Sequence, residues 1–140
     1  MRHPLHPALV HFPVACWSLA TLADFASLHW GEPAWHLAGV LLIVGLVMAL
    51  PALLAGLYEL SRVADDSPAW RSVYLHMGAM SAALLLYAIS LFARLDHAVL
   101  VAPGATALAC SAFGFIALAT GGWLGGKLVY EYQLGGAPPS

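Results

Sequence analysis

Histidines are the residues most able to do chemistry in this chain, which has seven of them among 140 residues. An imidazole can bind a metal or move a proton, and an ionisable group inside an apolar segment is a functional candidate by default. His3, His6 and His11 lie in the opening run HPLHPALVHFP, and His76 lies inside a later apolar segment. Two imidazoles that face one another could bind a single metal centre from both sides.

Glycines gather near the end of the chain, in the run TGGWLGGKLVY at residues 120–130. Gly121 is four residues before Gly125, and Gly122 is four residues before Gly126, so a helix would carry two rows of small residues. Such rows usually serve close packing between membrane helices. They would also leave room for a flat cofactor, and one row could meet a helix while the other meets a ring.

Haem b is the cofactor that the histidines and the glycine rows together favour. Two histidines from facing helices can bind haem iron axially, and small residues let the flat ring pass a helix. We predict His11 and His76 as the axial ligands and the four glycines as the flat wall. Arg71, near the start of its segment, could pair with a haem propionate.

A bare copper or zinc ion is the alternative. Imidazole nitrogen suits both metals, and thioether sulfur suits copper. His11 and His76 would again be ligands, with His6 as an alternative ligand and Met77 or Met80 as a sulfur donor. The sequence leaves open whether His6 or His11 is the ligand, because both lie near the same end of the first apolar segment.

A second polar feature lies toward the other end of the first segment. Asp24 follows His11 by 13 residues, which is roughly 20 Å along a helix. A charge inside an apolar segment needs a partner. His36, at the start of the next segment, is the nearest candidate, so we predict a structural Asp24–His36 pair.

Four apolar stretches must position these residues, because hydrophobic residues make up 61% of the chain and charged residues only 9%. A soluble domain needs more charge than this on its surface. Each stretch is about 20 residues long, which suits a membrane-spanning helix. We predict one all-α domain, residues 1–140, folded as an up-down-up-down bundle in a lipid bilayer. The predicted spans are about 8–28, 35–57, 70–92 and 104–128.

The basic residues predict the orientation of this bundle. We call face A the end that holds both termini and the connection at residues 59–68, and face B the opposite end. Arg2, Arg62, Arg71 and Lys127 belong to face A, whereas face B has only Arg94. The positive-inside rule then predicts cytoplasmic termini in a bacterial inner membrane. His11 and His76 would both lie roughly 5–10 Å below face A.

Several function classes are excluded by what the chain lacks. A net charge of −2 without a basic patch excludes nucleic acid as a partner. The sequence has no HExxH motif, no serine nucleophile elbow and no phosphate-binding loop, so it carries no hydrolase signature. Whether the chain is a redox enzyme stays open.

The opening HPLHPALVHFP, Asp24, His76 and the closing GGWLGGKLVY together resemble the uncharacterised bacterial membrane family called domain of unknown function 2231. The run HPxxVHFP is the most specific part of the resemblance, which covers the whole chain. The resemblance implies a four-span protein and, through members joined to cytochrome c-like or Rieske-type domains, a place in membrane electron transfer. The family pattern falls on His6, Pro7, His11, Pro13, Asp24, His76, Gly121, Gly122, Gly125 and Gly126.

We therefore predict a cytochrome b-like protein that binds haem b near the cytoplasmic face. It would pass electrons between a quinone or respiratory partner and another redox protein. The alternative is a non-redox membrane module. That module would be either a copper- or zinc-binding or transport protein, or a structural subunit that forms a homo-oligomer through its glycine rows.

Overall fold

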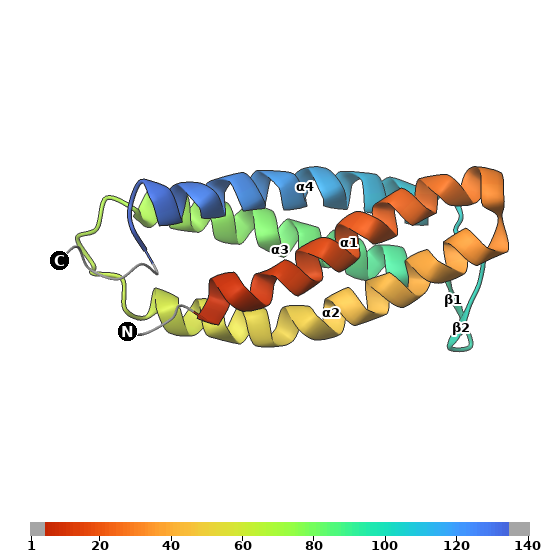
Figure 1. Cartoon of the computed structure of the whole chain (residues 1–140), viewed down its shortest axis with the longest axis horizontal. Coiled ribbons are helices and arrows are strands. Elements are labelled where there is room, and N and C mark those ends of the chain that lie inside the picture. The colour runs from red at the N-terminus through yellow and green to blue at the C-terminus, as the bar shows by residue number, and fades with distance from the viewer. Residues whose placement is uncertain (1–4, 135–140) are drawn as a thin grey trace.

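The computed structural model describes residues 5–134, which form an antiparallel bundle of four long helices (Figure 1). The helices are α1 (Leu5–Trp30), α2 (Glu32–Leu60), α3 (Trp70–Phe92) and α4 (Ala105–Tyr130). Each is long and apolar enough to cross a membrane. The predicted all-α, four-span bundle is confirmed. His3 lies outside the described residues.

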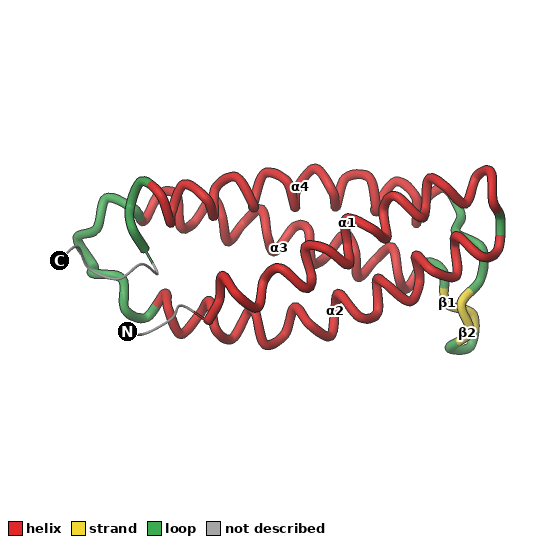
Figure 2. Tube along the Cα trace, viewed as in Figure 1, coloured by secondary structure: helices red, strands yellow, loops and turns green. Residues whose placement is uncertain are grey.

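The connection between α3 and α4 contains a small β-hairpin that the sequence did not predict (Figure 2). Strands β1 (Leu95–Asp96) and β2 (Val99–Leu100) pair antiparallel around a two-residue turn. The turn residues His97 and Ala98 have φ values of 48° and 66°. This left-handed conformation is usual for asparagine and glycine in such turns. The hairpin lies at face B, where the Leu100 side chain covers Gly39 of α2.

The α1–α2 hairpin and the α3–α4 hairpin repeat one another. A residue of α1 corresponds to the residue of α3 numbered 70 higher, and a residue of α2 to the residue of α4 numbered 69 higher. Residues 11–22 and 81–92 show the same order of buried, half-buried and exposed positions. Because both hairpins begin at face A, the axis that relates them runs along the bundle, as in parallel membrane repeats.

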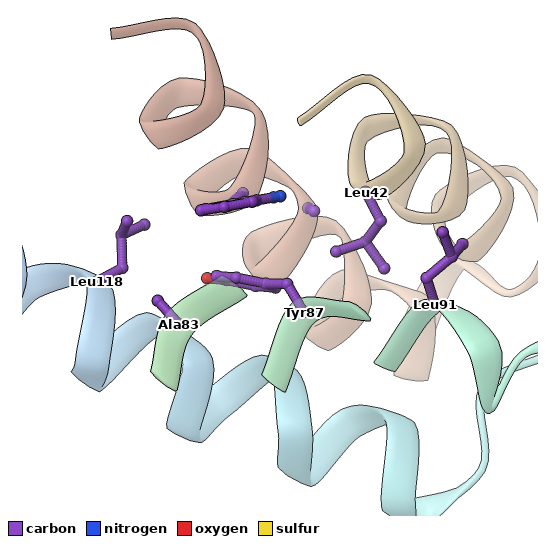
Figure 3. Packing of buried hydrophobic residues seen from close by; sticks show 7 residues of the cluster. Leu42, Ala83, Tyr87, Leu91 and Leu118 are labelled. Atoms are coloured by element: carbon purple, nitrogen blue, oxygen red, sulfur yellow. The ribbon is translucent and has the colours of Figure 1, made fainter. Parts of the chain in front are cut away.

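The hydrophobic core that joins the two hairpins follows this repeat. Trp17 lies against Gly45, and its counterpart Tyr87 lies against Gly114, the counterpart of Gly45. The Trp17 and Tyr87 rings stack with centroids 5.0 Å apart. Figure 3 shows Tyr87 in the middle of this core. The core cluster consists of Trp17, Ala20, Leu42, Ala83, Tyr87, Leu91 and Leu118.

Candidate functional site

His6 is held inside the first hairpin by hydrogen bonds to α2. Its Nδ1 lies 2.8 Å from the carbonyl oxygen of Ala52. The ring covers Gly56, where a Cβ atom would approach Nδ1 to 3.0 Å. The backbone N–H of His6 donates to Oε1 of Glu59 at 3.1 Å, so this first turn of α1 is anchored to the last turns of α2.

His76 is held inside the second hairpin in the same way. Its Nδ1 lies 2.8 Å from the carbonyl oxygen of Gly121, and its ring covers Gly125, where a Cβ would approach Cε1 to 3.1 Å. A carbonyl oxygen only accepts hydrogen bonds, so Nδ1 carries the proton in both histidines. The lone pair of each imidazole is therefore on Nε2, the arrangement that metal-binding histidines usually adopt.

The two imidazoles lie close to one another across the repeat axis. Their ring centroids are 6.4 Å apart and their planes are 87° apart. Two collinear imidazoles that share one ion, each with Nε2 about 2 Å from it, have centroids roughly 6 Å apart. The separation of His6 and His76 therefore matches a single metal centre bound from both sides.

The predicted pairing of His11 with His76 is not what the structure shows. His11 is exposed on the outer surface of α1, five residues past His6 and on a different side of the helix. The predicted depth was wrong because α1 begins at Leu5 instead of about residue 8. It also begins deeper in the bundle than the neighbouring helix ends do (Figure 1). Both effects bring His6 to the level of His76.

The two glycine rows of α4 have different surroundings. Gly121 and Gly125 face α3, where a Cβ on Gly121 would lie 2.5 Å from Sδ of Met80 and a Cβ on Gly125 would meet His76. This row serves helix packing. A Cβ added to Gly122 or Gly126 would meet nothing within 4 Å among the described residues, so these two form an open outward row. The four glycines therefore do not form one flat wall beside the histidines.

Two further residues that the sequence predicted as cofactor or metal contacts lie at the surface. Arg71 and Met77 are exposed. Lys127, which the sequence assigns to the basic residues of face A, lies 3.5 Å from Glu131, one turn further along α4. Among residues 5–134, no group of three or more histidine, cysteine, aspartate or glutamate side chains is arranged to hold a metal ion. The site thus offers two imidazole ligands within the described part of the chain.

One family model matches this chain, over residues 2–138, and describes a predicted membrane protein, DUF2231. The chain belongs to the DUF2231 family. No curated protein and no solved structure matches it. Membership agrees with the four apolar helices, so this DUF2231 protein is a multi-span protein of a lipid bilayer.

A second polar centre of this DUF2231 protein lies toward face B, and it differs from the prediction. Asp24 is fully buried and accepts two hydrogen bonds from Arg94, at 2.5 Å and 2.8 Å. His36 is exposed beside Trp35, so the predicted Asp24–His36 pair does not form. Asp24 and Arg94 are counterparts in the repeat, 70 residues apart.

Hydroxyl groups complete the Asp24–Arg94 centre. Ser111 Oγ donates to Oδ2 of Asp24 at 2.6 Å, and Ser90 Oγ accepts from Nη2 of Arg94 at 2.8 Å. Nε of Arg94 donates to the backbone carbonyl of Ser90 at 3.1 Å. The sequence did not predict this centre, because Arg94 follows an apolar run and reads as a loop residue. The chain compared with itself at a shift of 70 residues is almost without identities around Asp24 and Arg94, so the repeat that pairs them is visible only in the structure.

Proposed function

We propose that His6 and His76 bind the iron of a haem b and that the protein transfers electrons through it. The observation that carries this proposal is the equivalent setting of the two imidazoles. Each Nδ1 is bonded to a backbone carbonyl of its own hairpin, and the ring centroids lie 6.4 Å apart, so His6 and His76 could hold one iron between them. Two imidazoles are sufficient for haem, because the porphyrin supplies the other four nitrogens.

The chain's own residues would position and tune such a cofactor. The carbonyl groups of Ala52 and Gly121 fix the tautomer of the two histidines and make Nε2 a stronger donor. Glu59 holds the backbone at His6, so the first ligand stays in place although it is the second residue of α1. The four apolar helices would limit the access of water to the iron. When bound, the haem supplies reversible one-electron chemistry.

A bare copper ion is the competing occupant. One observation favours it over zinc: the thioether of Met80 lies against Gly121, whose carbonyl binds His76. Two imidazoles and a thioether suit copper, whereas structural zinc sites use four protein ligands. Under this alternative the protein would bind or transport copper and would carry no haem.

We also propose the bacterial inner membrane as its location, with face A in the cytoplasm. The described residues at face A include Arg62, Arg71 and Lys127. Arg94 is the one basic residue that the sequence assigns to face B, and its charge is buried against Asp24. The excess of basic residues at face A, which decides the orientation, is therefore stronger than the sequence indicated. The electron-transfer partner would be a quinone or a redox protein.

Absorption spectra test the proposed function. The protein is purified in detergent from haem-sufficient cells, and spectra are recorded before and after reduction with dithionite. We expect the Soret and α bands of a low-spin b-type haem. A colourless preparation with stoichiometric copper would replace haem by the copper alternative, and a colourless, metal-free preparation would contradict both.

Three variants then identify the ligands. His6→Ala and His76→Ala should each abolish the haem bands. His11→Ala is the matched control, because it removes an exposed imidazole from the same turns of α1 and should leave the spectrum unchanged. Haem bands that survive in both His6→Ala and His76→Ala would show that the assigned ligands are wrong.

A further inference from the structure

The interior of the bundle changes along its axis, and the change can be followed at positions that the repeat makes equivalent. Starting from His6 and His76, the Trp17/Tyr87 pair lies 11 residues further along the helices, or roughly 16 Å. The Asp24/Arg94 pair lies 18 residues further, or roughly 27 Å. The histidine pair thus lies in the third of the bundle nearest face A.

At the Trp17/Tyr87 level the space between the hairpins is filled. A ring covers a glycine in each hairpin here, as it does at the histidine level. However, the Trp17 and Tyr87 rings lie 5.0 Å apart and only 21° from parallel, so they are in direct contact. The Tyr87 hydroxyl is bonded to Oγ1 of Thr21 at 2.9 Å. A second planar cofactor has no room between these two rings.

At the Asp24/Arg94 level the hairpins are joined by compensated charges. Both carboxylate oxygens of Asp24 are occupied by Arg94 and Ser111, and both side chains of the ion pair are completely buried. An ion pair that is satisfied on all sides has no free atom for a redox ligand. It connects the two hairpins near face B.

We propose that the protein exchanges electrons through face A only, so that its electron donor and its electron acceptor both approach that face. This inference rests on the proposed haem site between His6 and His76. From His6 to the end of α1 at face B is 24 residues, or roughly 36 Å, and from His76 to the end of α3 at the same face is 16 residues, or roughly 24 Å. The rate of electron tunnelling falls exponentially with distance. The path toward face B is filled by the packed rings of Trp17 and Tyr87 and by the Asp24–Arg94 salt bridge. Of the two partner classes proposed above, a one-electron redox protein in the water phase at face A would therefore be favoured over a quinone.

The side of the histidine site that lies toward face A favours a water-soluble partner. His6 lies within the first turn of α1, and the carboxylate of Glu59 is half-buried beside its backbone. The site is therefore close to the polar surface at face A, where a water-soluble carrier can come near the edge of the haem. The protein would then be a redox relay at one side of the membrane and not a conductor across it.

Proteoliposomes of mixed orientation test this inference. A membrane-impermeant reductant, hexaammineruthenium(II), is added outside, and the fraction of haem that is reduced rapidly is measured from the α band. The orientation is measured separately with a membrane-impermeant maleimide on two cysteine variants. Asp65→Cys reports chains with face A outward, and Ala98→Cys reports chains with face B outward; both positions are exposed.

We expect the rapidly reduced fraction to equal the fraction labelled at position 65, with the remaining haem reduced only after detergent is added. A rapidly reduced fraction that follows the label at position 98, or rapid reduction of all the haem, would overturn the inference. Tyr87→Phe keeps the ring stack and removes its hydroxyl, so its reduction rate should be unchanged; a slower rate would indicate electron flow through the core. If the protein carries no haem, the proposed function itself fails, and that result is distinct.

Discussion

The pair His6/His76 and the pair Asp24/Arg94 are both formed by residues 70 positions apart, yet their hydrogen bonds are arranged differently. Each histidine bonds within its own hairpin, to a backbone carbonyl of the next helix. Asp24 and Arg94 bond to one another, across the two hairpins. The same geometric relation thus produces an intra-hairpin contact near face A and an inter-hairpin contact near face B.

The difference follows from the identity of the residues. Two identical imidazoles on opposite sides of an axis gain little from facing one another, so each needs a separate acceptor for Nδ1–H. Among the described residues, neither Nε2 has a hydrogen-bond partner. Opposite charges satisfy one another and must do so, because an uncompensated charge inside a membrane is costly. The repeat therefore produces two different arrangements. We call the pair His6/His76 the open site, because it can bind a further ligand. We call the pair Asp24/Arg94 the closed contact, because its members satisfy one another.

Removal of one imidazole is the change with the largest expected effect, and it tests whether the two halves of the open site are equivalent. His6→Gly and His76→Gly should each lose the haem completely, because both histidines would be needed to hold it between the two hairpins. Added imidazole should restore the Soret band in both variants by entering the vacated position. Restoration in only one of them would show that the repeat does not extend to ligand binding.

Removal of one charge from the closed contact, the Asp24/Arg94 pair, should have the next largest effect, here on stability. Asp24→Asn leaves a buried, unpaired guanidinium and should lower the free energy of unfolding by about 3–5 kcal/mol. The double variant Asp24→Leu with Arg94→Met removes both charges and should recover most of that loss. The measurement is unfolding in mixed SDS–detergent micelles, followed by circular dichroism. A loss below about 1 kcal/mol for Asp24→Asn would mean that the contact is no stronger than a surface ion pair.

Added methyl groups under the imidazoles test the equivalence of the two hairpins more finely. In Gly56→Ala and Gly125→Ala the new Cβ would lie 3.0 Å and 3.1 Å from an imidazole atom. Both variants should displace the ring, weaken haem retention and cost about 1–3 kcal/mol of stability through overpacking. Gly122→Ala is the control, since no other described residue comes within 4 Å of the added Cβ. Unequal effects of the first two changes would show that one hairpin determines the site alone.

The bundle was predictable from the sequence because lipid requires closed hydrogen bonding along each span, so four long apolar runs had to become four helices. The polar contacts inside the bundle were not predictable in the same way. The level of His6 depends on where α1 begins relative to the other helices, and hydropathy does not set that register. The partner of Asp24 depends on how two hairpins align, and Arg94 follows α3 directly, where a charge is read as part of a loop.

The smallest expected effect concerns the two links at face B, where the hairpins differ most. Gly31 makes the first link with φ of 63° and ψ of −136°, a combination that residues with a Cβ rarely adopt, whereas His97 and Ala98 make the second with φ values of 48° and 66°. Ala98→Gly should raise the free energy of unfolding by about 1 kcal/mol, because alanine is strained in this conformation. Gly31→Ala should lower it by about 1 kcal/mol or more, because a Cβ is strained at the φ and ψ of Gly31.

These two link variants also test whether changes at face B affect the histidine site near face A. Both links lie beyond the Asp24/Arg94 contact, at the far end of the bundle from His6 and His76, so the haem spectrum should be the same in each variant as in the parent protein. A stability change without a spectral change is expected if the buried ion pair isolates the histidine site from face B. A shifted Soret band in either variant would show that the open site and the closed contact are coupled, and the distinction between them would then have to be abandoned.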